Sequence, residues 1–101
     1  MLNDIDIDIL RAIANRPVLF AINKIEECYI FILGYSLAKP KKEIHGFINV
    51  KFTEFIKKST NTIDGEWYQI IRFQSTTDAA SLELFKKYFN AFLESIDNYT
   101  E

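Results

Sequence analysis

The sequence predicts an all-α fold, a single small bundle of four to five helices. Apolar residues recur at spacings of three and four along most of the chain, which is typical of helices that bury one face. Capping residues and prolines mark where such helices begin and end. With 101 residues, nine Phe and five Tyr, the chain has enough apolar volume for one core built from large rings. We therefore treat residues 1–101 as one domain.

The first helix is expected over residues 4–14. Its opening run, DIDIDI, alternates acidic and apolar residues, and over so few residues this alternation is also typical of a strand. However, Asn3 or Asp4 can cap a helix, and acids in a first turn lie favourably at the positive end of its dipole. Pro17 ends the helix, because the residue before a proline is pushed out of the α region.

Residues 17–40, PVLFAINKIEECYIFILGYSLAKP, are rich in apolar side chains but do not predict a membrane span. Polar and charged residues interrupt the stretch between Asn23 and Glu27. The apolar run after them is far shorter than the roughly 20 residues that a span needs. Residues 17–22 are instead expected to form a short turn or a single helical turn.

A second helix is expected over residues 24–38, with Asn23 at its N-cap and Glu26 completing a variant of the capping box. Apolar residues go most of the way round this segment, so we expect it to be the central and most buried helix. Gly34 costs about 1 kcal/mol relative to Ala inside a helix. The expected return is the close approach of a crossing helix at that point.

A third helix is predicted in the segment EIHGFINVKFTEFIKK. Six apolar residues there follow a spacing of three and four: Ile44, Phe47, Ile48, Phe52, Phe55 and Ile56. Gly46 weakens the first turn, so the regular part is expected to begin near Ile48. The polar run STNTIDGE after it predicts a loop.

Two further elements complete the expected bundle. Residues 67–73, WYQIIRF, individually prefer strands, but the run is short and has no evident strand partner, so a short helix is favoured over a strand. The final helix begins after Thr76 or Thr77 as its cap. An apolar stripe then continues to Ile96, which predicts the longest helix of the chain.

The composition gives no support to an enzyme or a metal site. Cys28 and His45 are the only residues of their types. A lone cysteine in an apolar run is typically a buried, inert thiol. The DIDID run lacks the glycine and bidentate glutamate of a calcium loop, since Ile9 and Asn15 stand in those positions. A solvated acidic helix start is expected there instead.

Charge and targeting features narrow the classes of partner. The formal net charge is −2, which argues against sequence-independent binding of nucleic acid. The N-terminus carries three aspartates and no basic region, so we expect no signal peptide. The lone cysteine is consistent with a reducing compartment. A cytoplasmic protein without a cofactor is therefore expected.

Two acidic pairs at turns are candidate partner-binding residues. One pair opens the second helix and the other flanks Gly65 in the polar loop: Glu26, Glu27, Asp64 and Glu66. Acids in such places can complement a basic partner and speed its association, although solubility and capping are the ordinary reading of such groups. Tyr29 or Trp67 is expected to supply an aromatic anchor if its ring is exposed.

The order of landmarks resembles a family of small bacterial immunity proteins of toxin systems, including contact-dependent growth inhibition. IANRPVLFAINKIEECYIFILGYSLA is similar to the start of that family, with an arginine-proline pair, a short aromatic segment and an aromatic helix ending in Gly-Tyr. FTEFIKK, WYQIIRF and AASLELFKKYFNAFL resemble its later helices. The likeness covers roughly residues 11–93. The chain departs from it at Val18 to Ala21, where the family often has a glycine-containing aromatic turn.

The resemblance implies a protein that binds one toxin domain tightly and has no catalytic residues of its own. The toxin is often a nuclease with a basic groove, so the expected partner is a basic toxin domain. No functional residue carries over by motif, because the shared landmarks look structural. The alternative, from the residues alone, is a small helical adaptor or regulatory domain that binds a cellular helix or assembles with itself.

Overall fold

The computed structural model describes residues 3–39 and 43–100, with side chains described as far as Ile96. The described residues contain helices and no strand, which confirms the all-α prediction. The elements are α1 (Asp4–Asn15), η1 (Pro17–Phe20), α2 (Ile25–Leu37), α3 (Glu43–His45), η2 (Gly46–Phe52), α4 (Thr53–Thr60), α5 (Trp67–Gln74) and α6 (Asp78–Thr100). The segment expected to be a helix or a strand, residues 67–73, is helical.

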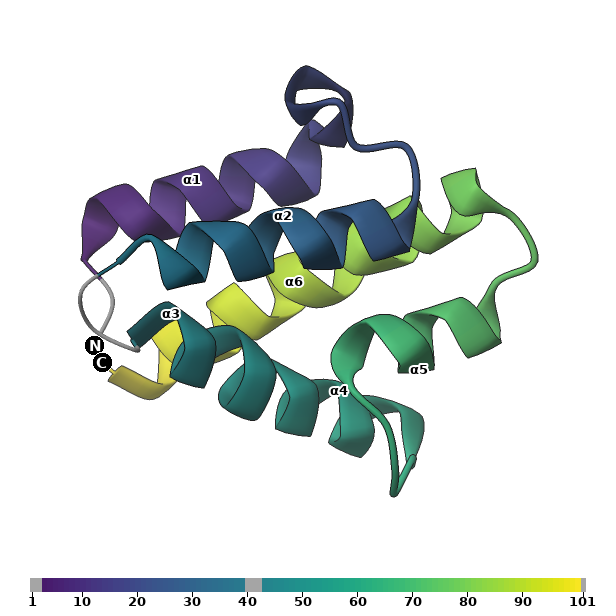
Figure 1. The fold of residues 1–101 in the computed structure, drawn as a ribbon. Helices are drawn as coiled ribbons and strands as arrows, with labels where there is room; N and C mark the ends of the chain where they lie inside the picture. The colour runs from purple at the N-terminus through teal and green to yellow at the C-terminus, as the bar shows by residue number, and fades with distance from the viewer. Residues whose placement is uncertain (1–2, 40–42, 101) are drawn as a thin grey trace.

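The long helices pack around α6, which contacts α1, α2 and α5. Figure 1 shows α1 and α2 running in opposite directions, joined through the 3₁₀ turn η1, with α6 behind them. The α3–η2–α4 helix and α5 form the lower part of the molecule in this view. In this view no helix lies in front of α2.

Capping residues in the sequence correctly predicted the starts of two helices. Asn3 caps α1 and its Oδ1 accepts a hydrogen bond of 2.8 Å from the Asp6 amide. Thr77 lies just before α6, and its Oγ1 accepts from the Ala80 amide at 3.0 Å. These bonds satisfy amides that have no partner within the first turn of a helix, so the two predicted caps are confirmed.

The third helix differs from its prediction in its internal geometry. It begins at Glu43, and its central part, Gly46–Phe52, is a π-helix rather than regular α-helix. Phe47 and Phe52 are five residues apart and both are buried, a spacing that the wider π turn brings onto one face. Regular α-helix begins only at Thr53.

An aromatic cluster centred on Phe52 forms the core. Its ring contacts four others at centroid distances between 5.3 and 5.8 Å: Trp67, Phe85, Phe89 and Phe92. Their tilted and edge-on arrangements are the favoured ones for aromatic pairs. The buried indole is not left unpaired, because Trp67 Nε1 donates to Asn49 Oδ1 at 3.4 Å.

The prediction that the second helix is the most buried one is wrong. Only Ile25, Cys28 and Ile32 of α2 are buried, and its outer side is open to solvent. Gly34 lies on that outer side, and a Cβ added there would meet nothing within 4 Å. Gly34 therefore does not sit at a crossing with another of the described helices.

The predicted cap of this helix is also wrong. Lys24 occupies the N-cap position of α2 and makes no side-chain capping bond. Asn23 uses its backbone amide instead, donating to Glu27 Oε1 at 2.7 Å. Glu26 is drawn away by an arginine from α5, so the capping box that its spacing suggested does not form.

The prediction of a solvated acidic helix start is wrong in one residue of α1, because Asp6 is buried. Its carboxylate accepts a hydrogen bond from the Tyr35 hydroxyl and forms an ion pair with Lys39, whose Nζ lies 3.2 Å away. The Tyr35 hydroxyl, and then Lys39, hold the pKa of Asp6 below its usual value, against the opposing effect of burial. This contact ties the start of α1 to the end of α2.

Candidate functional site

The two residues best suited to catalysis, Cys28 and His45, differ in their settings. Cys28 is buried and burial raises the pKa of its thiol to about 12, so the nucleophilic thiolate does not form at neutral pH. His45 is exposed on α3, and its Nδ1 lies 2.9 Å from the side-chain nitrogen Nδ2 of Asn49. Among the described residues there is no group of three His, Cys, Asp or Glu side chains able to hold a metal ion.

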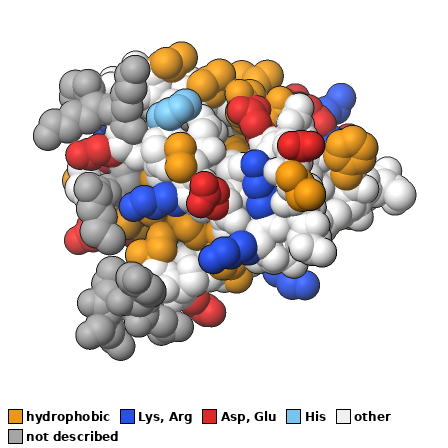
Figure 2. Space-filling view, turned by 90° about the horizontal axis from the view of Figure 1, so that it is seen from below, with side chains coloured by type: hydrophobic (Ala, Val, Ile, Leu, Met, Phe, Trp, Pro, Cys, Tyr) orange, Lys and Arg blue, Asp and Glu red, His pale blue; other side chains and the backbone are white. Residues whose placement is uncertain are grey.

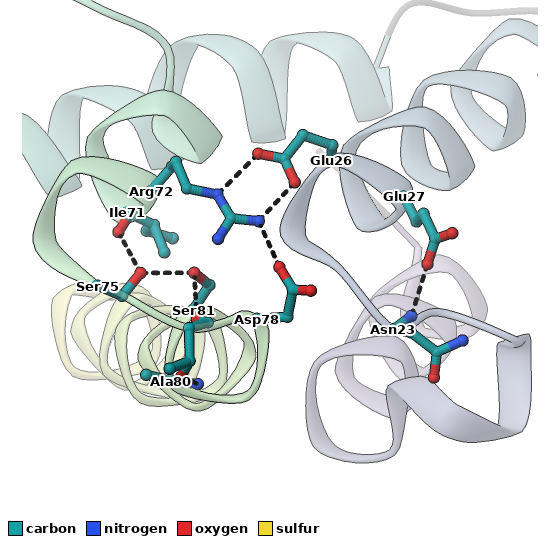
Figure 3. A network of polar contacts seen from close by, with 10 residues as sticks. Asn23, Glu26, Glu27, Ile71, Arg72, Ser75, Asp78, Ala80 and Ser81 are labelled. Carbon is teal, nitrogen blue, oxygen red and sulfur yellow. Dashed lines mark hydrogen bonds and ion pairs between the residues drawn. The ribbon is translucent and has the colours of Figure 1, made fainter.

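Glu26, the first of the four predicted partner-binding acids, belongs to an ion-pair network. The guanidinium of Arg72 on α5 donates to both of its carboxylate oxygens, at 2.8 and 2.6 Å, and to Asp78 at 2.9 Å (Figure 3). The hydrogen bonds to Arg72 lower the pKa of Glu26, and those to Glu26 and Asp78 raise the pKa of Arg72. This bidentate contact joins the starts of α2 and α6 to α5.

Glu27 and Glu66 each serve a helix start. Glu27 is exposed and accepts the hydrogen bond from the Asn23 amide seen in Figure 3. Glu66 is the N-cap of α5 and forms a capping box with Gln69, whose Oε1 accepts from the Glu66 amide at 2.9 Å. Both carboxylates face solvent, but reversing their charge disturbs a helix start as well as a surface.

Asp64 is the predicted acid whose position is most suited to a partner. It is exposed in the loop between α4 and α5 and lines a groove of about 570 Å³. Gly65 beside it has a φ of 107°, a conformation that glycine adopts without strain. The glycine thus shapes the loop that presents Asp64.

The predicted aromatic anchors are not available as proposed. Trp67 is 0% exposed and belongs to the core, so it does not meet the condition of exposure that an anchor requires. Tyr29 is partly buried, and its ring stacks on Tyr68 with 4.0 Å between centroids. The rings of Tyr29 and Trp67 therefore pack in the contact between α2 and α5.

Among the described residues, the most exposed aromatic side chain is that of Phe73, which was not among the predicted anchors. Its side chain is 90% exposed, and Ile63 in the loop before α5 is 85% exposed. The buried residues of α5 are Trp67, Ile70 and Ile71, at the spacing of one helix face. Phe73 follows Ile70 by three residues but lies about 120° round the helix axis from Trp67, outside the buried face, and this angle is the signal that could have identified it.

Phe73 stands between two hollows that meet along α5. The first is the 570 Å³ groove, and the second, of about 140 Å³, is lined by Glu26, Tyr68 and Arg72. Gln69 and Phe73 line both. We call the residues around these two hollows the α5 surface: Glu26, Ile63, Asp64, Tyr68, Gln69, Arg72 and Phe73. It brings Glu26 and Asp64 to one site, with an apolar ring between them.

The surface charges do not separate into large regions of one sign on the side seen in Figure 2. In that view from below, hydrophobic, basic and acidic side chains are interspersed. Such a face offers local contacts for a protein partner rather than a long basic track for a phosphate backbone. Within the described residues, no helix is both long and apolar enough to cross a membrane.

Comparison with known proteins does not add a relative to this picture. The chain matches no family model, no curated protein and no solved structure.

Proposed function

We propose that this protein is a non-enzymatic immunity protein of the bacterial cytoplasm, which binds a cognate toxin domain and neutralises it as a stoichiometric complex. The family resemblance supplies the class of partner. The structural observation that supports binding is the α5 surface, where an almost fully exposed Phe73 stands between two hollows. Exposed aromatic rings in such settings are characteristic of protein interfaces.

In the proposed complex, Phe73 inserts into an apolar pocket of the toxin and Ile63 packs at the edge of the same contact. Asp64 faces a basic side chain, because the expected partner is a nuclease with a positively charged substrate groove. Apolar burial then supplies most of the affinity, and the acid supplies orientation and a faster encounter. Inhibition follows from exclusion of the substrate.

The alternative function is that of a small helical adaptor, and a separate feature supports it. The outer side of α2 carries exposed apolar residues that no described helix covers. An adaptor that binds a cellular helix offers a surface of this kind. The two functions differ in the identity of the partner, so they are separated by capture with a defined toxin.

The test is co-purification with the protein encoded immediately upstream, followed by protection of cells that express its toxin domain. We expect a one-to-one complex and survival with the wild type. Phe73→Asp should abolish protection, since it places a charge in the apolar contact. Val50→Asp is the matched control, because Val50 is also an exposed apolar residue, at 51% exposure, but lies on η2 rather than α5.

Charge is tested separately through Asp64→Lys. This variant leaves intact both the Arg72 ion pair that a Glu26 variant would break and the helix cap that a Glu66 variant would disturb. This variant should associate more slowly than the wild type, and added salt should reduce the difference. No complex between the wild type and the upstream protein contradicts the immunity function and favours the adaptor. A complex that tolerates Phe73→Asp contradicts the α5 surface alone.

A further inference from the structure

The 570 Å³ groove of the α5 surface contains one charged group. Its other lining residues are apolar or are polar without a charge, and the charge is the Asp64 carboxylate in the loop before α5. The ion pairs among the described residues use other acids, which are Asp6, Asp8, Glu26 and Asp78. The groove therefore presents a negative charge that no cation of the described residues pairs with.

The cations of the neighbouring elements do not supply the missing partner. Arg72 lines the adjoining hollow, but its guanidinium is already bound to carboxylates of α2 and α6 at 2.6 to 2.9 Å (Figure 3). Lys57 and Lys58 lie in the last turn of α4, and neither of them lines the groove. A cation that neutralises Asp64 in the groove therefore comes from outside the described residues.

Two apolar side chains beside this carboxylate are left in solvent. Ile63 precedes Asp64 in the loop and Phe73 lies on α5, and the two are 85% and 90% exposed. Both line the groove together with Asp64. The groove thus offers apolar walls for a hydrocarbon stem and a negative charge for the end of that stem. Lysine and arginine are the side chains that combine an apolar stem with a cationic end.

The aromatic wall of the groove favours arginine over lysine. A planar guanidinium stacks on aromatic rings and binds a carboxylate through two parallel hydrogen bonds. The lysine ammonium is a compact and strongly hydrated point charge, so it gains less from a ring beside the carboxylate. Cations found over aromatic rings in proteins are more often arginine, and arginine is enriched at protein interfaces.

We infer that the groove receives an arginine side chain of a partner protein, with its guanidinium on Asp64 and its stem against Ile63 and Phe73. The surface continues past Phe73 into the second hollow, so the arginine belongs to a protein and is not a free amino acid. This inference rests on the proposed function, in which the partner is the toxin domain, and it names the residue type that meets Asp64.

The first experiment needs no toxin and titrates the purified full chain with blocked amino acids, followed by NMR of the backbone amides. N-acetyl-arginine methylamide should shift the amides of Asp64 and Gly65, with a dissociation constant of about 10–100 mM. The citrulline analogue has nearly the same shape without the charge. It and the lysine analogue should each bind at least about threefold more weakly.

Two matched variants show whether the carboxylate in the groove is responsible. Asp64→Asn removes the charge and keeps the shape of the side chain, so it should abolish the difference between the arginine and citrulline analogues. Glu54→Gln removes an exposed acid of α4 that does not line the groove, and it should keep that difference. The amide spectra themselves show that both variants are folded.

The second experiment locates the arginine in the complex with the upstream-encoded toxin domain. Each exposed arginine of the toxin domain is replaced by alanine, and its affinity for the wild type and for Asp64→Asn is measured by calorimetry. One replacement should weaken binding to the wild type by at least about tenfold and binding to Asp64→Asn by much less, because both changes remove the same contact.

The outcomes separate this inference from the function on which it rests. Groove amides that do not shift, or that respond equally to the arginine and citrulline analogues, would overturn the arginine site. A stable complex in which no arginine couples to Asp64 would also overturn it, while leaving the immunity function in place. No complex between the wild type and the upstream protein would instead overturn the immunity function, and with it the toxin as the source of the arginine.

Discussion

Trp67 and Phe73 stand at opposite ends of α5 and at opposite extremes of exposure, 0% against 90%. Both are large apolar rings, so hydrophobicity does not account for the difference. At about 100° per residue, Phe73 lies about 120° round the helix from Trp67. Trp67 points at the cluster around Phe52, whereas Phe73 points away from it. The position around the helix, and not the residue type, decides which ring stabilises the fold and which is free for a partner.

The same contrast separates the two sides of α2. Its inner residues pack into the core and its outer residues, although equally apolar, meet solvent. Apolar side chains in this molecule therefore divide into a buried folding set and an exposed set. Substitutions that affect stability in one set and leave it unchanged in the other test this division directly.

The largest loss of stability is expected from Phe52→Ala at the centre of the core. The change removes a ring that contacts four other aromatic rings and leaves a cavity, at a cost of about 3–5 kcal/mol. Urea denaturation followed by circular dichroism measures the free energy of unfolding. The milder Phe52→Leu serves if the alanine variant does not fold. A loss below about 1 kcal/mol would contradict the assignment of Phe52 to the core.

The next effect is expected at the buried contact between Tyr35 and Asp6. Tyr35→Phe removes the hydroxyl that donates to this carboxylate, which should cost about 1–3 kcal/mol at neutral pH. Tyr88→Phe is the control, because the Tyr88 hydroxyl donates to exposed Gln74. Equal stabilities of the two variants would contradict a structural role for the Asp6 contact.

This contact also predicts a pH dependence. The pKa of Asp6 is lowered from 3.8 by the Tyr35 hydroxyl first and by Lys39. Because the folded state favours the ionised form, its stabilisation is present above the unfolded pKa and is lost as pH falls through the lower folded pKa. The difference between wild type and Tyr35→Phe should therefore shrink below about pH 4. Denaturation at several acidic pH values measures it.

A smaller change, of opposite sign, is expected at Gly34. Gly34→Ala should stabilise the fold by about 0.5–1 kcal/mol, because alanine favours the helix and its methyl group meets open space. Urea denaturation measures the change. Gly65→Ala provides the contrast and should destabilise, since Gly65 has a φ of 107°. Destabilisation by Gly34→Ala would return this glycine to a crossing within the chain.

The features predicted correctly from the sequence depend on neighbours along the chain. Asn3 and Thr77 cap helices through bonds to amides three residues away, and the spacing of apolar residues gave the long helices. Residues 67–73 are helical although they prefer strands, because no strand partner exists among the described residues. Such features need only the local sequence and the absence of a competing pairing.

The predictions that were wrong depend on contacts between residues far apart in the sequence. Glu26 and Arg72 are separated by 46 positions, and their contact removes Glu26 from the capping box that its spacing suggested. The exposure of one side of α2 depends on where α5 and α6 pack, which the composition of α2 does not state. Among the candidate site residues, the exposure of Asp64 could be predicted from its polar loop alone. The exposure of Phe73 depends on how the whole of α5 is oriented against the core, which the local sequence does not state.

The smallest effect on stability, and the sharpest test of the division, is expected at Phe73. Phe73→Ala removes a ring that is 90% exposed and that forms none of the aromatic contacts in the core. The free energy of unfolding should therefore change by no more than about 0.5 kcal/mol.

If Phe73 is the anchor of the α5 surface, the same variant should bind the upstream-encoded toxin domain at least about tenfold more weakly, a loss of about 1.4 kcal/mol. Stability is measured by urea denaturation and affinity by calorimetry on the same preparation. Val50→Ala, which removes exposed apolar surface from η2, should change neither quantity by a comparable amount. A large loss of stability in Phe73→Ala would place this ring in the folding set. Unchanged affinity would leave its exposure without a role in toxin binding.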